Sequence, residues 1–280
     1  MARNIICTIA LGLMCLSATG QDGVEYLKAN AIRIDNPNKL SDSIYHLLSP
    51  FEVIMFGEMH GTNESTPFVN GLVSLLTANG DSVQVGLEIS LTLMTQFILQ
   101  RTDSSIYQSD FFRNPPFMDG KESVPWATLI AKLNRNAKVN IFFFDVAQDE
   151  TKSSYQRDSL MFVKIKTQFM QHPSWKMVTL SGNYHNRIEG ATMTSFLKQD
   201  KELNLSSKIC SLNLEYKEGT CMANFSGEGF KKKELGSYPS VYNSTTGYDN
   251  YLLLVSPKSN YEYNGMYYIK YITAATMTAH

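Results

Sequence analysis

Short, wholly apolar runs alternate with amphipathic stretches through most of this sequence, and that alternation restricts the fold more than any other feature. Strands that are apolar throughout are typical of parallel sheets buried on both faces, and helices between them make right-handed crossovers. The sequence therefore predicts an α/β protein with a mostly parallel central sheet flanked by helices. Five runs have the length and the β-branched or aromatic content of strands: residues 51–56, 83–87, 138–146, 176–185 and 207–216.

Helical periodicity fills the intervals between these runs. The pair Thr66-Pro67 indicates a helix start, with threonine as N-cap and proline at the first helical position. Residues 102–122 look irregular and are predicted to form an insertion or a lid over a site, and residues 217–250 are predicted to be rich in loops. Further helices are predicted near residues 91–101, 124–136, 154–171 and 191–199. Late strands at residues 251–255 and 267–272 are predicted to form a partly antiparallel edge.

Ionisable or amide side chains follow four of the predicted strands in turn. In open α/β sheets, ligands bind beyond the carboxyl ends of the strands, so these side chains are candidates for a site. Any one of them could instead cap a helix or be a satisfied polar group of the core. Together they would crowd one rim, where a metal, a shared proton or a cationic partner would offset their repulsion. The candidates are Glu58 and His60, then Glu88, then Asp145, then Asn183 and His185.

Two nearby features sharpen this hypothesis. Glu58 and His60 are two residues apart, so on extended backbone they project to the same side. In the pair Arg157-Asp158, near the start of a predicted helix, Asp158 could simply favour the helix dipole, while Arg157 could reach the acidic rim as its cationic partner. Trp126 and the aromatic residues of the insertion could line an apolar pocket, or could only pack over the core; those of the insertion are Tyr107, Phe111, Phe112 and Phe117.

The N-terminus has the arrangement of a secretory signal peptide. Arg3 precedes an apolar stretch, and small residues follow, ending at Gly20. We therefore expect a signal peptide over residues 1–20, one α/β domain over residues 21–280, and export to the periplasm or the exterior. Cys210 and Cys221 would remain after cleavage, and in an oxidising compartment they could form a disulfide or be two buried thiols.

Composition excludes some partners. The formal net charge is −1 and no basic run is long, which argues against a nucleic-acid partner. The short lysine run at residues 231–233 is predicted to be a solvated loop. No later stretch reaches membrane length, so no stable membrane span is expected.

Four motifs in this order resemble the superfamily of erythromycin esterases, haem-binding ChaN proteins and Tiki/TraB proteins. They are FGEMHGTNE, GLE, RDSLM and LSGNYHN, and the similarity covers roughly residues 50–190. The resemblance implies an α/β fold, a site at Glu58, His60, Glu88 and His185, and a helix-start arginine at Arg157. The spacing of Glu58 and His60 is closer to that of ChaN and Tiki proteins, because erythromycin esterases have one more residue between the two.

The same resemblance leaves two functions open. The first is an exported hydrolase of ester, lactone or amide bonds in a small-molecule or peptide substrate. His60 would be the general base for a water, with Glu58 orienting it or sharing a proton, and Glu88 and His185 would complete the site as acid–base groups. As in Tiki proteins, Glu58, His60, Glu88 and His185 could instead hold a divalent metal. The second function is a ChaN-like protein that binds haem or iron without hydrolytic activity, with the aromatic insertion covering the macrocycle.

Overall fold

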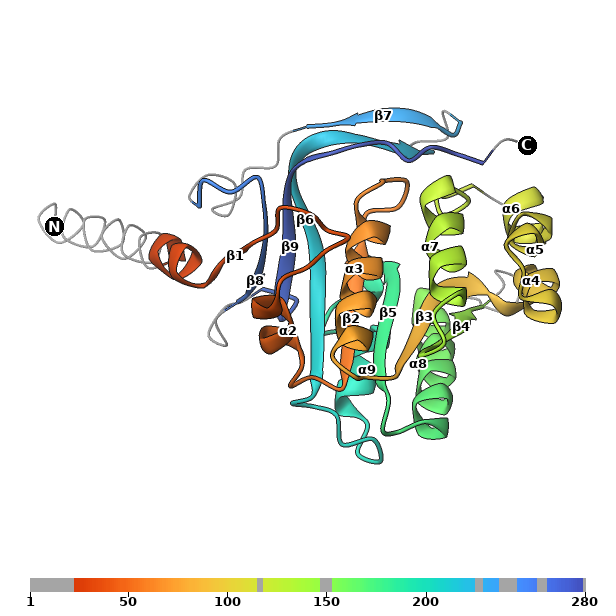
Figure 1. Cartoon of the computed structure of the whole chain (residues 1–280), viewed down its shortest axis with the longest axis horizontal. Helices are drawn as coiled ribbons and strands as arrows, with labels where there is room; N and C mark the ends of the chain where they lie inside the picture. Colours follow the sequence, from red (N-terminus) through yellow and green to blue (C-terminus); the bar gives the residue numbers. More distant parts are fainter. Residues whose placement is uncertain are drawn as a thin grey trace, which may run out of the picture.

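A computed structural model describes residues 23–114, 118–146, 153–224, 229–236, 246–255 and 261–278. Within these residues the strands form one nine-stranded sheet in the order β1-β8-β9-β6-β2-β5-β3-β4, and β7 pairs with β6 (Figure 1). The strands are β1 (Ile32–Arg33), β2 (Val53–Glu58), β3 (Val83–Ser90), β4 (Val139–Asp145), β5 (Lys176–Gly182), β6 (Ile209–Ala223), β7 (Lys231–Leu235), β8 (Asn250–Leu254) and β9 (Gly265–Ile272).

Strand direction confirms the predicted class. Each pair of neighbouring strands is parallel along the part of the sheet that runs β9, β6, β2, β5, β3, β4. At the other end β8 pairs antiparallel with β9 and β1 antiparallel with β8, which gives the partly antiparallel edge. The order also places β5 between β2 and β3, so that the ends of β2, β5, β3 and β4 are successive neighbours. This arrangement positions the candidate site.

Helices cover both faces of the sheet, with α3 and α7 on one face and α8 and α9 on the other (Figure 1). Strand β2 shows why its sequence is apolar throughout: Ile54 and Phe56 pack toward α3, while Val53 and Met55 pack toward α8 and α9. The helices and short helical turns are α2 (Asp42–Leu48), α3 (Ser65–Ala78), η1 (Leu91–Met94), α4 (Thr95–Gln100), α5 (Asp103–Gln108), α6 (Asp110–Arg113), α7 (Val124–Asn134), α8 (Ser154–Gln171), η3 (Asn183–Asn186) and α9 (Met193–Gln199).

The predicted irregular insertion is more ordered than expected. Residues 102–122 contain the short helices α5 and α6, and the prediction of an irregular segment was wrong over that part. The Thr102 hydroxyl accepts a hydrogen bond from the Ser105 backbone N–H, and the Ser105 hydroxyl accepts one from the Thr102 N–H. This reciprocal cap stabilises a helix too short to show periodicity. Phe111, Phe112 and Trp126 belong to the main hydrophobic core, so they pack over it rather than line a pocket; Phe117 lies outside the described residues.

The loop-rich prediction for residues 217–250 was also wrong in part. Strand β6 continues to Ala223, and the lysine run opens β7, which pairs antiparallel with the end of β6. In the described part of the chain β7 pairs with β6 alone, which places these lysines on a sheet edge, where charged side chains discourage pairing with another chain.

Cys210 and Cys221 are both buried and free, so the possible disulfide between them is wrong. Both residues lie on β6, eleven positions apart in the sequence. An extended strand separates them by about 36 Å, at about 3.3 Å per residue, whereas a disulfide needs Cα atoms less than about 7 Å apart. The alternative of two buried thiols describes the pair.

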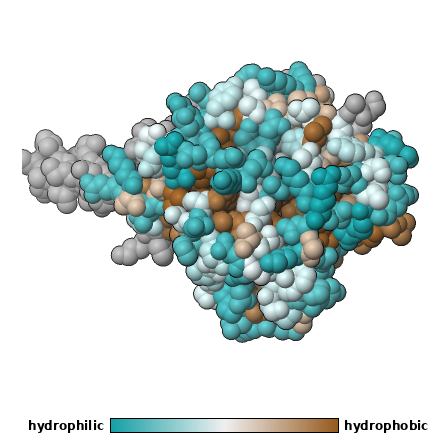
Figure 2. Space-filling view, viewed as in Figure 1, coloured by the Kyte–Doolittle hydropathy of each residue, from teal (hydrophilic) through white to brown (hydrophobic). Residues whose placement is uncertain are grey.

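The predicted signal peptide, residues 1–20, falls outside the described residues. Within the described ranges, no helix combines the length and the apolar character needed to cross a membrane. Hydrophilic residues cover most of the face seen in Figure 2, with hydrophobic residues visible between them.

Candidate functional site

Strand register brings the predicted side chains to one rim of the sheet. Glu58, the last residue of β2, is opposite Gly182, the last residue of β5. Leu87 of β3 is opposite Leu180 of β5, so Glu88 follows at nearly the same level. Asp145 ends β4 opposite Ser90 of β3. The four strand ends that the sequence singled out are therefore adjacent in space.

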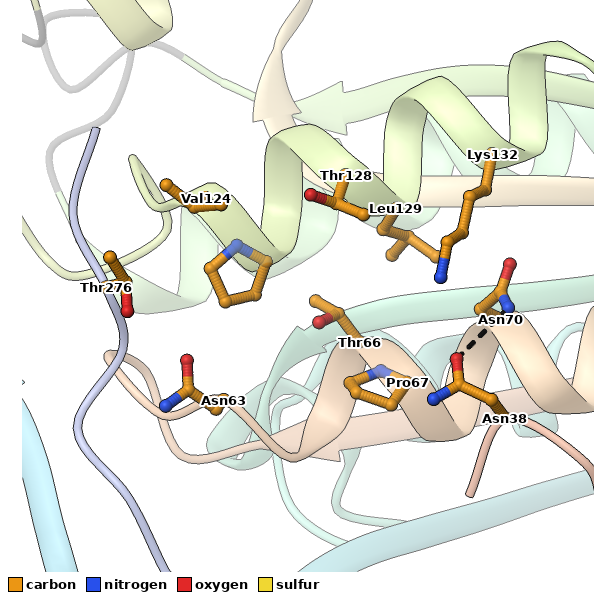
Figure 3. A pocket seen from close by; sticks show the side chains of 11 residues that line it. Asn38, Asn63, Thr66, Pro67, Asn70, Val124, Thr128, Leu129, Lys132 and Thr276 are labelled. Atoms are coloured by element: carbon orange, nitrogen blue, oxygen red, sulfur yellow. Dashed lines mark hydrogen bonds between the residues drawn. The ribbon is translucent and has the colours of Figure 1, made fainter. Parts of the chain in front are cut away.

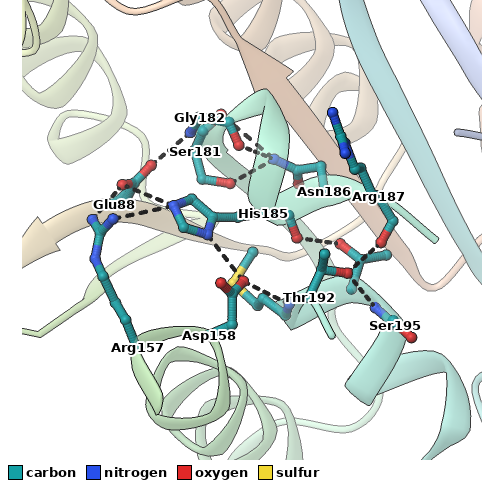
Figure 4. Close-up of polar contacts among 12 residues, drawn as sticks. Glu88, Arg157, Asp158, Ser181, Gly182, His185, Asn186, Arg187, Thr192 and Ser195 are labelled. Carbon is teal, nitrogen blue, oxygen red and sulfur yellow. Dashed lines mark hydrogen bonds and ion pairs between the residues drawn. The ribbon is translucent and has the colours of Figure 1, made fainter. Parts of the chain in front are cut away.

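Glu88 is the centre of the polar network (Figure 4). Its Oε1 accepts hydrogen bonds from Arg157 Nη2 at 2.6 Å and Lys121 Nζ at 3.1 Å, and its Oε2 accepts one from the Gly182 backbone N–H at 2.6 Å. The side chain is 1% exposed. Burial alone would raise its pKa, but Lys121, the two histidines and Arg157 outweigh that effect and hold the pKa of Glu88 well below its usual range.

Arg157 joins three of the predicted residues. Its guanidinium binds Asp145 through two hydrogen bonds, Nε to Oδ1 at 2.9 Å and Nη2 to Oδ2 at 2.8 Å. Nη2 also binds Glu88, and Nη1 lies 3.2 Å from His185 Nε2. Arg157 lies in the first turn of α8, whose start is fixed by the Ser153 hydroxyl accepting a hydrogen bond from the Gln156 N–H. The arginine therefore reaches the acidic rim as its cationic partner.

His185 is engaged at both ring nitrogens. Because a guanidinium only donates, Nε2 must accept from Arg157, and Nδ1 carries the hydrogen that it donates to Asp158 Oδ1 at 2.9 Å. Asp158 is fully buried, and the same oxygen accepts the Met193 backbone N–H. The sequence did not predict Asp158 as a site residue, because next to Arg157 it looks like an ordinary carboxylate near a helix start. His185 thus orients Arg157 and has no free nitrogen.

His60 is held differently and keeps one nitrogen open. Its Nδ1 is 2.8 Å from Glu58 Oε1, and its Nε2 is 3.9 Å from Glu88 Oε2. The side chain is 29% exposed, whereas that of Glu58 is buried. Burial and Lys121 lower the pKa of the imidazole, but the hydrogen bond to Glu58 and the charges of Asp119 and Glu88 outweigh them and raise it to about 9. His60 is therefore the imidazole of this set that can exchange a proton with a ligand.

Gly182 lets His60 approach the end of β5 closely. A Cβ on Gly182 would lie 2.8 Å from His60 Nε2 and 3.6 Å from Glu88 Oε2, so a larger residue there would displace the imidazole. His60 Nε2 and Glu88 Oε2, 3.9 Å apart, can share a water that lies to one side of the line between them, at about 2.8 Å from each. The absence of a side chain at the end of β5 therefore allows a base and a carboxylate to lie side by side.

Lys121 is a site residue that the sequence did not predict. It comes from the segment between α6 and α7, its side chain is 3% exposed, and its Nζ lies 3.1 Å from both Glu88 Oε1 and Asp119 Oδ2. The pattern visible in the sequence was the Asp119-Gly120 turn just before it, which points to a tight bend and not to a buried cation.

Asn183 does not join the network. The residue is exposed, and its main-chain carbonyl accepts a hydrogen bond from the Tyr263 hydroxyl. The buried amide nearby is Asn186, whose Nδ2 donates to Ser181 Oγ and to the Gly182 carbonyl. Asn186 thereby fixes the turn that carries His185.

The donor set does not fit a divalent metal ion. Among the described residues, no group of three or more His, Cys, Asp or Glu side chains is arranged to hold one. Each oxygen of Glu88 already accepts a hydrogen bond, and two of the three donors are the cations Arg157 and Lys121. A dication at Glu88 would face two positive charges within hydrogen-bond distance of the same carboxylate.

A separate groove of about 380 Å³ lies between α3 and α7 (Figure 3). Asparagine and threonine side chains and Lys132 line it, together with Pro67, Val124, Pro125 and Leu129. None of the predicted site residues reaches this groove.

Comparison with known proteins supports the fold at low sequence identity. No protein-family model matches the chain, and no curated protein matches it. A succinoglycan biosynthesis protein superposes with a TM-score of 0.69 and 8% identity, over 93% of this chain and 99% of its own. The erythromycin esterase EreC, as a histidine-to-asparagine mutant in its open conformation, gives a TM-score of 0.61 and 8% identity over 87% and 97%.

A haem-binding ChaN protein of Campylobacter jejuni gives a TM-score of 0.41 and 17% identity, over 62% of this chain and 85% of its own. The fold implied by the four motifs is confirmed by the EreC superposition. The succinoglycan biosynthesis protein and EreC are described by different roles. One fold can host unrelated activities. Function must therefore be argued from the site.

Proposed function

We propose that this protein is an exported hydrolase that uses His60 as general base to cleave an ester, lactone or amide bond. One observation carries the proposal: the open Nε2 of His60 faces Glu88 Oε2 across 3.9 Å, at the strand end where Gly182 has no side chain. A water there would be within hydrogen-bond reach of both a proton acceptor and an orienting carboxylate. The likeness to an erythromycin esterase, at the level of fold, supports the same class of reaction.

The proposed reaction follows from these positions. The water oxygen attacks the carbonyl carbon while His60 Nε2 takes one water proton, and Glu58 stabilises the resulting imidazolium through Nδ1. Negative charge develops on the carbonyl oxygen, and Arg157, the more accessible cation at 27% exposure, favours it. When the intermediate collapses, the bond to the leaving oxygen or nitrogen breaks and His60 returns the proton to that atom. Glu58, Glu88 and His185 act as positioning residues.

The proposal is tested with purified protein and a panel of chromogenic esters, lactones and amides. Turnover that exceeds that of a His60→Gln variant on at least one of these classes supports it. Absence of turnover on the whole panel contradicts it. A stable visible absorption band on titration with haem, without turnover, would favour the haem-binding alternative.

A side chain at Gly182 should displace His60 and remove activity while the backbone stays as it is. Gly182 has φ −54° and ψ 141°, which alanine adopts without strain. In Gly182→Ala the new methyl group would lie 2.8 Å from His60 Nε2, so we expect kcat/KM to fall by about 10²-fold. Gly236→Ala is the matched control, because a Cβ there meets no atom within 4 Å. Equal kcat/KM in the two variants would show that activity does not depend on the position of His60 beside Gly182.

Removing the charge of Glu58 should move the pH dependence of activity toward acid. Protonated His60 cannot accept a proton, so kcat/KM of the wild type should rise with pH up to about 9, the pKa of His60. In Glu58→Gln the hydrogen bond that raises this pKa loses its negatively charged acceptor, and the acidic limb should move to lower pH. Glu64→Gln is the control, because Glu64 bonds Thr273 and does not contact His60. An unmoved limb in Glu58→Gln would argue against His60 as the titrating base.

A further inference from the structure

We propose that Lys121 is a positioning residue of this site, holding Glu88 beside His60 with the positive charge that a divalent ion would otherwise supply. The inference rests on the proposed function for its kinetic consequences. Its structural part, a built-in cation at Glu88 that makes a divalent ion unnecessary, stands on contacts alone.

Burial shows that Lys121 acts through Glu88 and not through the substrate. Its side chain is 3% exposed, so it has almost no surface to offer a ligand. A buried ammonium is costly unless it is paired, and both of its carboxylate partners are present: Glu88 Oε1 and Asp119 Oδ2, each 3.1 Å from Nζ. Lys121 and Arg157 bind the same oxygen of Glu88, which leaves Oε2 to face Gly182 and His60.

The backbone around Lys121 is fixed to the loop that carries His60. Gly120, with φ +99°, packs so closely that a Cβ there would lie 2.3 Å from Gly61 Cα. The C-terminal segment ties both: the Ala275 N–H donates to the Gly61 carbonyl at 2.8 Å, and the Thr278 hydroxyl donates to the Glu122 carbonyl at 3.0 Å. A lysine attached this firmly to the residue after His60 holds Glu88 and His60 in one geometry.

The same contacts exclude a divalent ion at Glu88 unless Lys121 is displaced. Glu88 Oε1 accepts from two cations and Oε2 from a backbone N–H. Removing the ammonium would leave a buried carboxylate with room for an added cation. The wild type should therefore be indifferent to divalent ions, and a variant that lacks the lysine side chain should respond to them.

The first test replaces the charge and keeps most of the volume. In Lys121→Met we expect kcat to fall by about 10²-fold, with KM nearly unchanged because Lys121 does not touch the substrate. Lys121→Arg keeps the charge and should retain more kcat than the methionine variant. Lys132→Met, in the groove between α3 and α7 (Figure 3), controls for loss of a lysine elsewhere and should behave as wild type. Equal losses in the arginine and methionine variants would overturn the proposal.

The second test uses thermal midpoints and so does not depend on turnover. Wild-type protein should keep its midpoint in EDTA and gain nothing from Mn²⁺, whereas Mn²⁺ should raise the midpoint of Lys121→Ala. A wild-type midpoint that falls in EDTA and recovers with Mn²⁺ overturns the proposal, and so does a wild-type midpoint that Mn²⁺ raises. If the wild type hydrolyses nothing on the panel, the proposed function fails while these midpoints still decide the role of Lys121. If Lys121→Ala does not fold, the wild-type midpoints and Lys121→Arg decide it.

Discussion

His60→Gln should lower kcat/KM by about 10²- to 10⁴-fold, the usual contribution of a general base, and leave the fold intact. Glutamine has nearly the size of histidine but no basic nitrogen, so a water bonded to this side chain would lose its proton acceptor. The side chain is 29% exposed and packs little, which limits the effect on stability. Steady-state kinetics and thermal unfolding of the variant measure both effects.

The stability of this variant should itself depend on pH in a defined direction. The pKa of His60 is raised to about 9 in the folded protein from an ordinary value of 6.5. A raised imidazole pKa contributes stability that is fully present below the unfolded pKa and is lost as pH rises through the folded one. His60→Gln should therefore be less stable than wild type at pH 6 and indistinguishable from it above pH 9 by this mechanism. The control His46→Gln, on the exposed face of α2, should change neither kinetics nor stability. Full activity in His60→Gln would contradict the mechanism.

Local pattern was enough to predict the sheet and the rim, because both depend on short-range signals. Residue type along β2 predicts a strand buried on both faces, and a ligand position beyond the carboxyl ends of the strands follows from parallel topology. The order of β2, β5, β3 and β4 was not predictable, since it depends on crossovers that pass over a neighbouring strand. That order places Gly182 opposite Glu58.

Long-range contacts explain the residues that sequence reasoning did not find. Lys121 reaches Glu88 from a segment 33 positions away in the sequence, and nothing in its neighbours distinguishes it from a surface lysine. Asp158 was visible only as a helix-start carboxylate, because its partner His185 lies 27 positions away. Conversely, Asn183 lies in one of the motifs but does not reach the site. The turn at residues 183–186 leaves Asn183 exposed and buries His185.

Glu88→Gln should destabilise the protein by about 3–5 kcal/mol, the cost of leaving buried charges without their partner. The substitution keeps the shape of the side chain but removes the negative charge that Arg157 and Lys121 share, at a position 1% exposed. Because the pKa of Glu88 is lowered in the folded protein, its contribution to stability is present above the unfolded pKa and is lost as pH falls through the folded one. The difference between variant and wild type should therefore be full at pH 7 and shrink in acid.

Glu122→Gln is the matched control. Glu122 is as buried as Glu88, but its negative charge destabilises the folded protein instead of stabilising it. Burial, with the charge of Asp119, raises the pKa of Glu122 to about 7. A raised carboxyl pKa removes stability as pH increases from the unfolded value toward the folded one. Glu122→Gln should therefore be near neutral in acid and more stable than wild type above pH 7, the opposite trend to Glu88→Gln. Chemical unfolding of both variants at pH 5, 7 and 8.5 measures the two slopes. If they run in the same direction, the charge of Glu88 does not hold Arg157 and Lys121 together, and the site geometry must be maintained by packing instead.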